Sequence, residues 1–235
     1  MKKFLIFSGA GLSADSGLST FRGKSGDELW SNHSIHKVCD LLTWKSNIAG
    51  VHEFYNQRRA DVAVAQPNAA HKMISDWQKR YDAKVITQNV DDLLERAGAA
   101  DVLHVHGRLS DMKCVACGKE WEIGLVDWNP EEDRCICGSR KGVKPGVIFF
   151  NEQAPRYVDM FRAFKGLAGG DLLVVVGTSG QVIDIGSLAR KTTARTVLIN
   201  LEANADLDGK FDMVIHGKVA DEIDLIDTIV RNHFA

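Results

Sequence analysis

Short apolar runs recur along the chain, and each run ends in small or polar residues. Six of them lie at residues 3–8, 84–87, 102–105, 171–176, 196–200 and 212–216. Continuous apolar runs of this length are typical of strands that are buried on both faces. Helical patterning separates them at residues 48–64, 68–80, 91–97, 155–167 and 219–233. This alternation predicts an α/β fold with a doubly wound parallel sheet of Rossmann type, which carries ligands at the carboxyl ends of its strands.

Two stretches interrupt this alternation. Residues 31–80 are mostly helical, and residues 113–142 are charged and carry four cysteines. We expect them to form a smaller inserted lobe from a helical module and a metal-binding module. Residues 1–30, 81–112 and 143–235 would then form the Rossmann-type domain.

Composition narrows the class of protein. The chain has 235 residues, is 45% hydrophobic and has a formal net charge of −2, so a sizeable core is expected and neither nucleic acid nor an anionic membrane is the expected partner. The apolar run after the first two lysines is too short for a secretion signal, and no run is long enough to span a membrane. We therefore expect a cytoplasmic protein, with a monomer as the working expectation.

The first strand candidate ends in Gly9-Ala10-Gly11, which leads into a predicted helix start. Glycines let the backbone approach a ligand, and the N–H groups of a first helical turn attract phosphate. The spacing is G-x-G-x5-G, which differs from the G-x-G-x-x-G of dinucleotide-binding folds. A plain glycine turn is the alternative.

Polar side chains follow two further strand candidates. Gln88, Asn89 and Asp91 come after the second, where they are either ligands of a nicotinamide or ribose or ordinary helix caps. His104 and His106 occupy alternate positions of the third. One of the two is a candidate general base, and a packed histidine is the alternative.

Four of the five cysteines have the spacing C-x2-C-x17-C-x-C, which is typical of a zinc ribbon. The predicted ligands are Cys114, Cys117, Cys135 and Cys137. Four thiolates leave no coordination position for water, so the zinc is expected to be structural, with reduced thiols as the alternative. The last pair, with one intervening residue, is unusually tight.

Several segments occur in a fixed order: GAGLSADSGLSTFRG, TQNVDDLLERAG, HVHGRL, the four-cysteine module, PGVIFFNE, VVGTSG and INLE. Together they resemble the sirtuin family of NAD-dependent protein deacylases, from about Phe4 to Ala220. The resemblance implies that the Rossmann-type domain binds NAD as co-substrate, that the cysteines hold one zinc ion, and that acylated lysines of proteins are the partners.

The resemblance also implies residue roles. His106 would be the catalytic base, and Asn89 would be catalytic as well. The cofactor would be bound by Gly9, Ala10, Gly11, Ser13, Phe21, Arg22, Gln88, Asn89, Asp91, Gly177, Thr178, Ser179, Asn200, Glu202 and Ala220. The extended segment 145–150, with Val147 and Phe149, would bind the substrate peptide through its backbone.

Tyr55 and Arg58 share a face of the predicted helix 48–64. They resemble the Tyr-x-x-Arg of class III sirtuins, in which the phenol and the guanidinium suit the carboxylate of a succinyl-, malonyl- or glutaryl-lysine. The alternative is an exposed arginine on a surface helix. Cys39 stands where class III members carry alanine, either as a wall of the acyl pocket or as a buried core thiol.

The expected activity is deacylation of lysine, both deacetylation and desuccinylation or demalonylation, with release of nicotinamide and O-acyl-ADP-ribose. An NAD glycohydrolase or ADP-ribosyltransferase, or an NAD-sensing module without catalysis, are the alternatives. Two departures from the family pattern bear on loops: Asn151 replaces a glycine, and Asp184 replaces a proline, which predicts a freer loop at 181–186.

Overall fold

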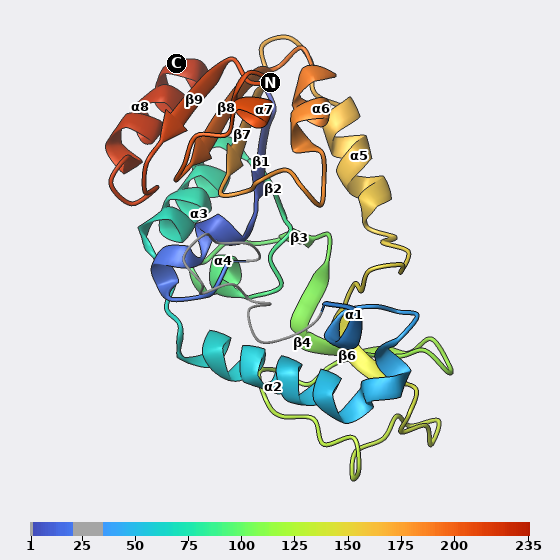
Figure 1. The fold of residues 1–235 in the computed structure, drawn as a ribbon. Helices are drawn as coiled ribbons and strands as arrows, with labels where there is room; N and C mark the ends of the chain where they lie inside the picture. The colour runs from blue at the N-terminus through green and yellow to red at the C-terminus, as the bar shows by residue number, and fades with distance from the viewer. Residues whose placement is uncertain (1, 21–34) are drawn as a thin grey trace.

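The computed structural model describes residues 2–20 and 35–235, and its larger part is a six-stranded parallel sheet (Figure 1). The strand order is β3-β2-β1-β7-β8-β9. This is the Rossmann order, in which connections reverse direction between the first strand and its neighbour, here β1 and β7. The strands are β1 (Phe4–Ser8), β2 (Lys84–Thr87), β3 (Leu103–His104), β7 (Leu172–Val176), β8 (Arg195–Asn200) and β9 (Met213–His216).

Helices cover both faces of this sheet, as Figure 1 shows. Successive side chains of β1 point to opposite faces of the sheet, so each face has its own hydrophobic core. Ile6 packs in the core that contains Trp77, and Phe7 packs edge-on against Phe164, at 5.8 Å, in the core on the other face. The helices of the first face are α3 (Ala69–Tyr81) and α8 (Ile223–Phe234), and those of the second are α5 (Tyr157–Lys165) and α6 (Ile185–Arg190). Two single-turn helices are α4 (Leu93–Arg96) and α7 (Ala205–Asp208).

The smaller lobe combines helices with a three-stranded antiparallel sheet of order β5-β4-β6. Its elements are α1 (Ile35–Val38), the 3₁₀ turn η3 (Trp44–Asn47), α2 (Ile48–Val64), β4 (Gly107–Cys114), β5 (Glu120–Glu122) and β6 (Val143–Val147). The fully buried Arg59 fixes α2 to this sheet, because its Nε donates to the carbonyl of Leu109 at 2.8 Å.

The fold class expected from the sequence is confirmed, with differences in detail. The glycine turn does not open an α-helix, because two short 3₁₀ turns, η1 (Ala10–Leu12) and η2 (Ala14–Ser16), follow β1. The third strand ends at His104, so His106 lies in a turn rather than on the strand. The division of the chain into domains stays a prediction, and the small sheet extends beyond 113–142 at both ends.

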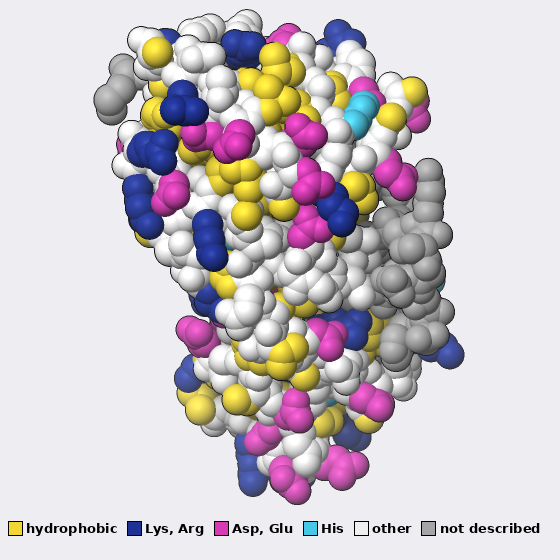
Figure 2. Space-filling model, turned by 90° about the vertical axis from the view of Figure 1, so that its left-hand side faces the viewer, with side chains coloured by type: hydrophobic (Ala, Val, Ile, Leu, Met, Phe, Trp, Pro, Cys, Tyr) yellow, Lys and Arg dark blue, Asp and Glu magenta, His cyan; other side chains and the backbone are white. Residues whose placement is uncertain are grey.

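The surface offers no large area of one charge on the face drawn in Figure 2, where basic and acidic side chains are interspersed. None of the helices within residues 2–20 and 35–235 is long and apolar enough to cross a membrane.

Candidate active site

One cavity of about 1670 Å³ collects most of the predicted site residues. It lies at the carboxyl ends of β1, β2, β7 and β8 and extends to the helix α2 of the small lobe. Its position at the point where the strand order reverses is the usual ligand site of an open α/β sheet. The predicted site residues that line the cavity are Ala10, Gly11, Ser13, Tyr55, Arg58, Gln88, Asn89, Asp91, His106, Val147, Phe149, Gly177, Thr178, Ser179, Asn200 and Glu202.

Other predicted residues fall elsewhere. Gly9 lies beneath the lining, and the exposed Ala220 is not part of it, although its neighbour Val219 is. Phe21 and Arg22 lie outside the described residues.

Gly11 and Gly177 form the floor of the cavity by direct backbone contact, and Gly9 packs beneath them. The N–H of Gly11 donates to the carbonyl of Gly177 at 2.8 Å. A Cβ added at Gly11 would lie 2.7 Å from Cα of Gly177, and one at Gly9 would lie 2.8 Å from the Gly177 carbonyl oxygen. Gly177 itself has φ 64°, a conformation that favours glycine. Close packing of the two loops, besides ligand approach, therefore accounts for these glycines.

A buried hydrogen-bond network holds the polar side chains after β2. The hydroxyl of Ser13 donates to Oδ2 of Asp91 at 2.9 Å and accepts from Nδ2 of Asn89 at 3.1 Å. Nε2 of His71 lies 3.3 Å from the same hydroxyl, while its Nδ1 accepts from the N–H of Asn68, so Nε2 carries the proton and donates to Ser13. Burial lowers the pKa of His71 to about 4 and raises the pKa of Asp91. The network therefore fixes the Asn89 amide at the cavity.

His71 and Asn68 were not predicted as site residues. A sequence signal for this pair does exist, because an asparagine followed three residues later by a polar side chain is typical of a capped helix start. Asn68 caps α3, and His71 at the third helical position is its partner.

A second group of hydrogen bonds shapes the loop after β7. The amide of Gln88 donates to Oγ1 of Thr178 at 2.9 Å. The amide of Asn200 accepts from the N–H of Thr178 at 3.0 Å and donates to its carbonyl at 2.9 Å. Asn200 therefore holds the 177–179 loop in place, a supporting contact that sequence patterns do not reveal.

The two histidines of the HVHG segment have different surroundings. His104 is buried between the carbonyl of Asn89, at 2.8 Å, and Oε1 of Glu95, at 2.7 Å, and it does not line the cavity. His106 does line it. Nδ1 of His106 lies 3.1 Å from the carbonyl of Gln88, which only accepts, so Nδ1 carries the proton and Nε2 is the basic nitrogen. Burial lowers the pKa of His106 below its ordinary value, which keeps the imidazole neutral at physiological pH.

The part of the cavity formed by the small lobe is aromatic, and Arg58 contributes a guanidinium to it. Tyr55 is buried, stacks on Phe149 at 5.8 Å, and donates its hydroxyl to Sγ of Cys39 at 3.3 Å. Arg58 pairs with Oδ2 of Asp61 at 2.8 Å along the same helix. Cys39 both lines the cavity and belongs to the core of the lobe, so the two interpretations of this thiol are compatible.

The extended segment that was predicted to bind peptide is partly paired with the chain itself. The N–H of Ile148 donates to the carbonyl of His106 at 2.8 Å, and the N–H of Phe150 donates to the carbonyl of Cys39 at 2.9 Å. Regular strand pairing ends at Val147.

Asp184 does not loosen the loop at 181–186, contrary to the expectation. Its side chain caps α6 by accepting from the N–H of Ser187 at 3.0 Å, and Nζ of Lys210 lies 3.6 Å from it. An N-cap carboxylate replaces the conformational restriction that a proline would give.

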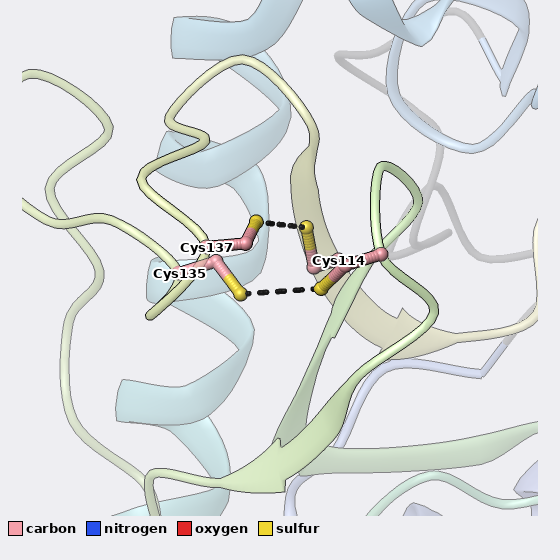
Figure 3. A group of neighbouring side chains, drawn as sticks. Cys114, Cys135 and Cys137 are labelled. Atoms are coloured by element: carbon pink, nitrogen blue, oxygen red, sulfur yellow. Dashed lines mark hydrogen bonds between the residues drawn. The ribbon is translucent and has the colours of Figure 1, made fainter.

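The four predicted zinc ligands converge (Figure 3). Their sulfur atoms all lie within 4.8 Å of one another, with 3.7 Å between Cys114 and Cys137 and 3.6 Å between Cys117 and Cys135. Zinc–sulfur bonds of about 2.3 Å in a tetrahedron place sulfurs roughly 3.8 Å apart, so the group fits one zinc ion. Gly118 and Gly138 have positive φ and follow the second and fourth cysteines, which closes both turns.

Comparison with known proteins agrees with this arrangement. The pattern of the Sir2 family matches residues 9–184. The NAD-dependent protein deacylase of Helicobacter hepaticus is 36% identical, over 100% of this chain and 99% of its own length. The enzyme of the same name from Campylobacter jejuni, strain NCTC 11168, is 36% identical, over 99% of this chain and 97% of its own.

Solved structures agree as well. A Sir2 homologue in complex with NAD superimposes with a TM-score of 0.85 at 32% identity, over 99% of this chain and 91% of that one. A mutant of a Sir2 homologue in complex with ADP-ribose gives a TM-score of 0.87 at 30% identity, over 99% and 93%. The chain belongs to the Sir2 family.

Proposed function

We propose that the protein is an NAD-dependent protein-lysine deacylase that removes acetyl and acidic acyl groups. The observation that carries the proposal is that the neutral imidazole of His106, the fixed amide of Asn89 and the guanidinium of Arg58 all line the same cavity. The names of the relatives from Helicobacter and Campylobacter support it.

We infer that NAD occupies the sheet end of the cavity. The floor of glycines suits the close approach of a pyrophosphate, and the loop 177–179 supplies further N–H groups and hydroxyls. Asn89 and Asp91 would bind the nicotinamide amide and ribose hydroxyls, and Glu202 would bind the adenosine ribose. The complexes of Sir2 homologues with NAD and with ADP-ribose support this placement.

In the proposed reaction, the acyl oxygen of the modified lysine attacks C1′ of the nicotinamide ribose, and nicotinamide leaves with the electrons of the broken C–N bond. His106 then accepts a proton from the ribose hydroxyls so that the 2′-oxygen attacks the acyl carbon. Water releases free lysine and O-acyl-ADP-ribose. Retention of a neutral His106, whose Nε2 accepts a proton, supports this role.

We infer that Tyr55 and Arg58 recognise an acidic acyl group at the other end of the cavity. A substrate carboxylate is a stronger acceptor than the Cys39 thiol, so it would replace that thiol as the partner of Tyr55. It would also compete with Asp61 for Arg58. Succinyl and malonyl groups carry such a carboxylate, and acetyl groups do not.

The test is NAD consumption with acetyl-, succinyl- and malonyl-lysine peptides and without peptide. Turnover that requires the peptide and yields free lysine supports deacylation. NAD loss at the same rate without peptide would establish a glycohydrolase instead.

A further inference from the structure

The basic nitrogen of His106 is occupied by a side chain of the protein itself. Nε2 of His106 lies 2.8 Å from the hydroxyl of Tyr157. Tyr157 lines the same cavity and was not singled out by any sequence pattern. The contact joins the turn after β3 to the first residue of α5, two segments that are 51 residues apart.

The direction of this hydrogen bond follows from the other nitrogen. Nδ1 of His106 donates to the Gln88 carbonyl, so the neutral ring has a single acceptor, Nε2. The Tyr157 hydroxyl must therefore be the donor. A substrate hydroxyl that gives its proton to His106 needs the same lone pair, and the two donors cannot use it together.

We propose that Tyr157 is a positioning residue that caps Nε2 of His106 in the substrate-free protein and is displaced by the substrate hydroxyl that His106 deprotonates. This inference rests on the proposed function in one respect, the assignment of His106 as the base. The cap holds the imidazole in the tautomer that the reaction needs and keeps its acceptor nitrogen satisfied until the substrate arrives.

The placement of Tyr157 allows displacement. It begins α5, and its side chain is only partly buried. Its ring packs edge-on against Phe161 at 6.0 Å, a contact that does not involve the hydroxyl. Its ring also lies 5.8 Å from the ring of His106. We expect loss of the hydroxyl alone to leave both ring contacts in place.

The hydrogen bond from Tyr157 should change the pKa of His106 in a definite direction. Burial lowers the pKa of His106 and the hydrogen bond to the Gln88 carbonyl raises it. Because a donor to the neutral imidazole disfavours protonation, we expect the Tyr157 hydroxyl to lower that pKa further. The other titratable side chains that line the cavity from segments in contact with His106 are Asp91 and Glu152.

The experiment compares Tyr157→Phe with the matched control Tyr81→Phe. Tyr81 lies at the end of α3 and stacks on Phe234 at 4.7 Å, outside the cavity. Nitrogen-15 NMR of the imidazoles, with His106 assigned by its loss in His106→Ala, measures its tautomer and pKa without any substrate. We expect Tyr157→Phe to raise the pKa of His106 by roughly half a unit to one unit, and Tyr81→Phe to leave it unchanged.

The pH profile of kcat/KM for NAD-dependent deacylation is the second measurement. Its acid limb should move upward by the same amount in Tyr157→Phe, because that limb reports the free enzyme's base. An unchanged NMR pKa in Tyr157→Phe would overturn the cap. A shifted NMR pKa with an unshifted acid limb would instead contradict His106 as the base, and thus the proposed mechanism.

Discussion

Asn151 donates its side-chain amide to both carboxylate oxygens of Asp40, each at 3.1 Å. Asn151 itself has φ 63°, in the left-handed region where glycine and asparagine are tolerated best. The contact connects the loop after β6 with the loop after α1. Asp40 directly follows Cys39, which lines the cavity. Asparagine thus adopts a backbone conformation that glycine also permits, and its side chain links the two loops.

Replacement of Asn151 should therefore show a definite order of stability. Asn151→Ala loses the hydrogen bonds and leaves a side chain in the left-handed region, so we expect a loss of roughly 1–2 kcal/mol in the free energy of unfolding. Asn151→Gly loses the hydrogen bonds but relieves the backbone, and should cost less. Urea unfolding of the wild-type protein and the two variants measures the free energy of unfolding. Equal losses for alanine and glycine would show that the backbone conformation is not strained.

Deacylation should depend on a neutral His106. Because burial lowers the pKa of His106, kcat/KM should stay constant near neutral pH and fall only as the pH drops through a midpoint below about 6.5, where Nε2 becomes protonated. His106→Ala should abolish deacylation, whereas His233→Ala, near the end of α8 and outside the cavity lining, should not. A midpoint above 7 in the wild-type protein would contradict the assignment.

Arg58→Met should depress desuccinylation roughly tenfold to a hundredfold and leave deacetylation nearly unchanged, because only the succinyl group offers a carboxylate. Asp61→Asn should have the opposite effect on desuccinylation, since it removes the carboxylate that pairs with Arg58 in the substrate-free protein. Steady-state kinetics with the two acyl peptides measures both variants.

Arg80→Met is the matched control for these variants, because Arg80 is exposed on α3 and its nearest carboxylate, that of Asp227, is 3.9 Å away. It should leave both activities unchanged. Equal loss of deacetylation and desuccinylation in Arg58→Met would mean that Arg58 supports folding rather than acyl recognition.

The cysteine cluster should hold about one zinc ion per chain. Cys137→Ser should lower the zinc content below half an equivalent and destabilise the small lobe, because metal binding and folding are coupled. Cys39→Ser, outside the cluster, should retain the metal. Elemental analysis of protein purified without chelator measures the zinc content. Less than half an equivalent of zinc per chain in the wild-type protein would refute the zinc site.

Buried strands and the clustering of the four cysteines could be predicted well from the sequence, because their signals are local. The run of buried residues in β7 and the spacing of the four cysteines each identify a structure without knowledge of the rest of the chain. Helix ends were less accurate, and the short helices α6 and α7 were not predicted, because four to six residues carry too few apolar positions to show a helical period.

Contacts between segments that are distant in the sequence could not be predicted from local sequence signals. The cap of Tyr157 on His106 and the link of Asn151 to Asp40 join residues 51 and 111 positions apart, and nothing in either local sequence indicates its partner. The pairing of Arg58 with Asp61 is local, but helical spacing alone allows several partners for one arginine.

The contact of Gly11 with Gly177 has a consequence for biosynthesis. The floor of the cavity joins segments that are 166 residues apart in the sequence (177 − 11), and β1 pairs with β7 only when β7 has been synthesised. A growing chain therefore cannot close the floor until the ribosome has passed residue 177, so ligand binding can assist folding only late in synthesis. Two fragments divided between these segments would form the floor only on reassociation.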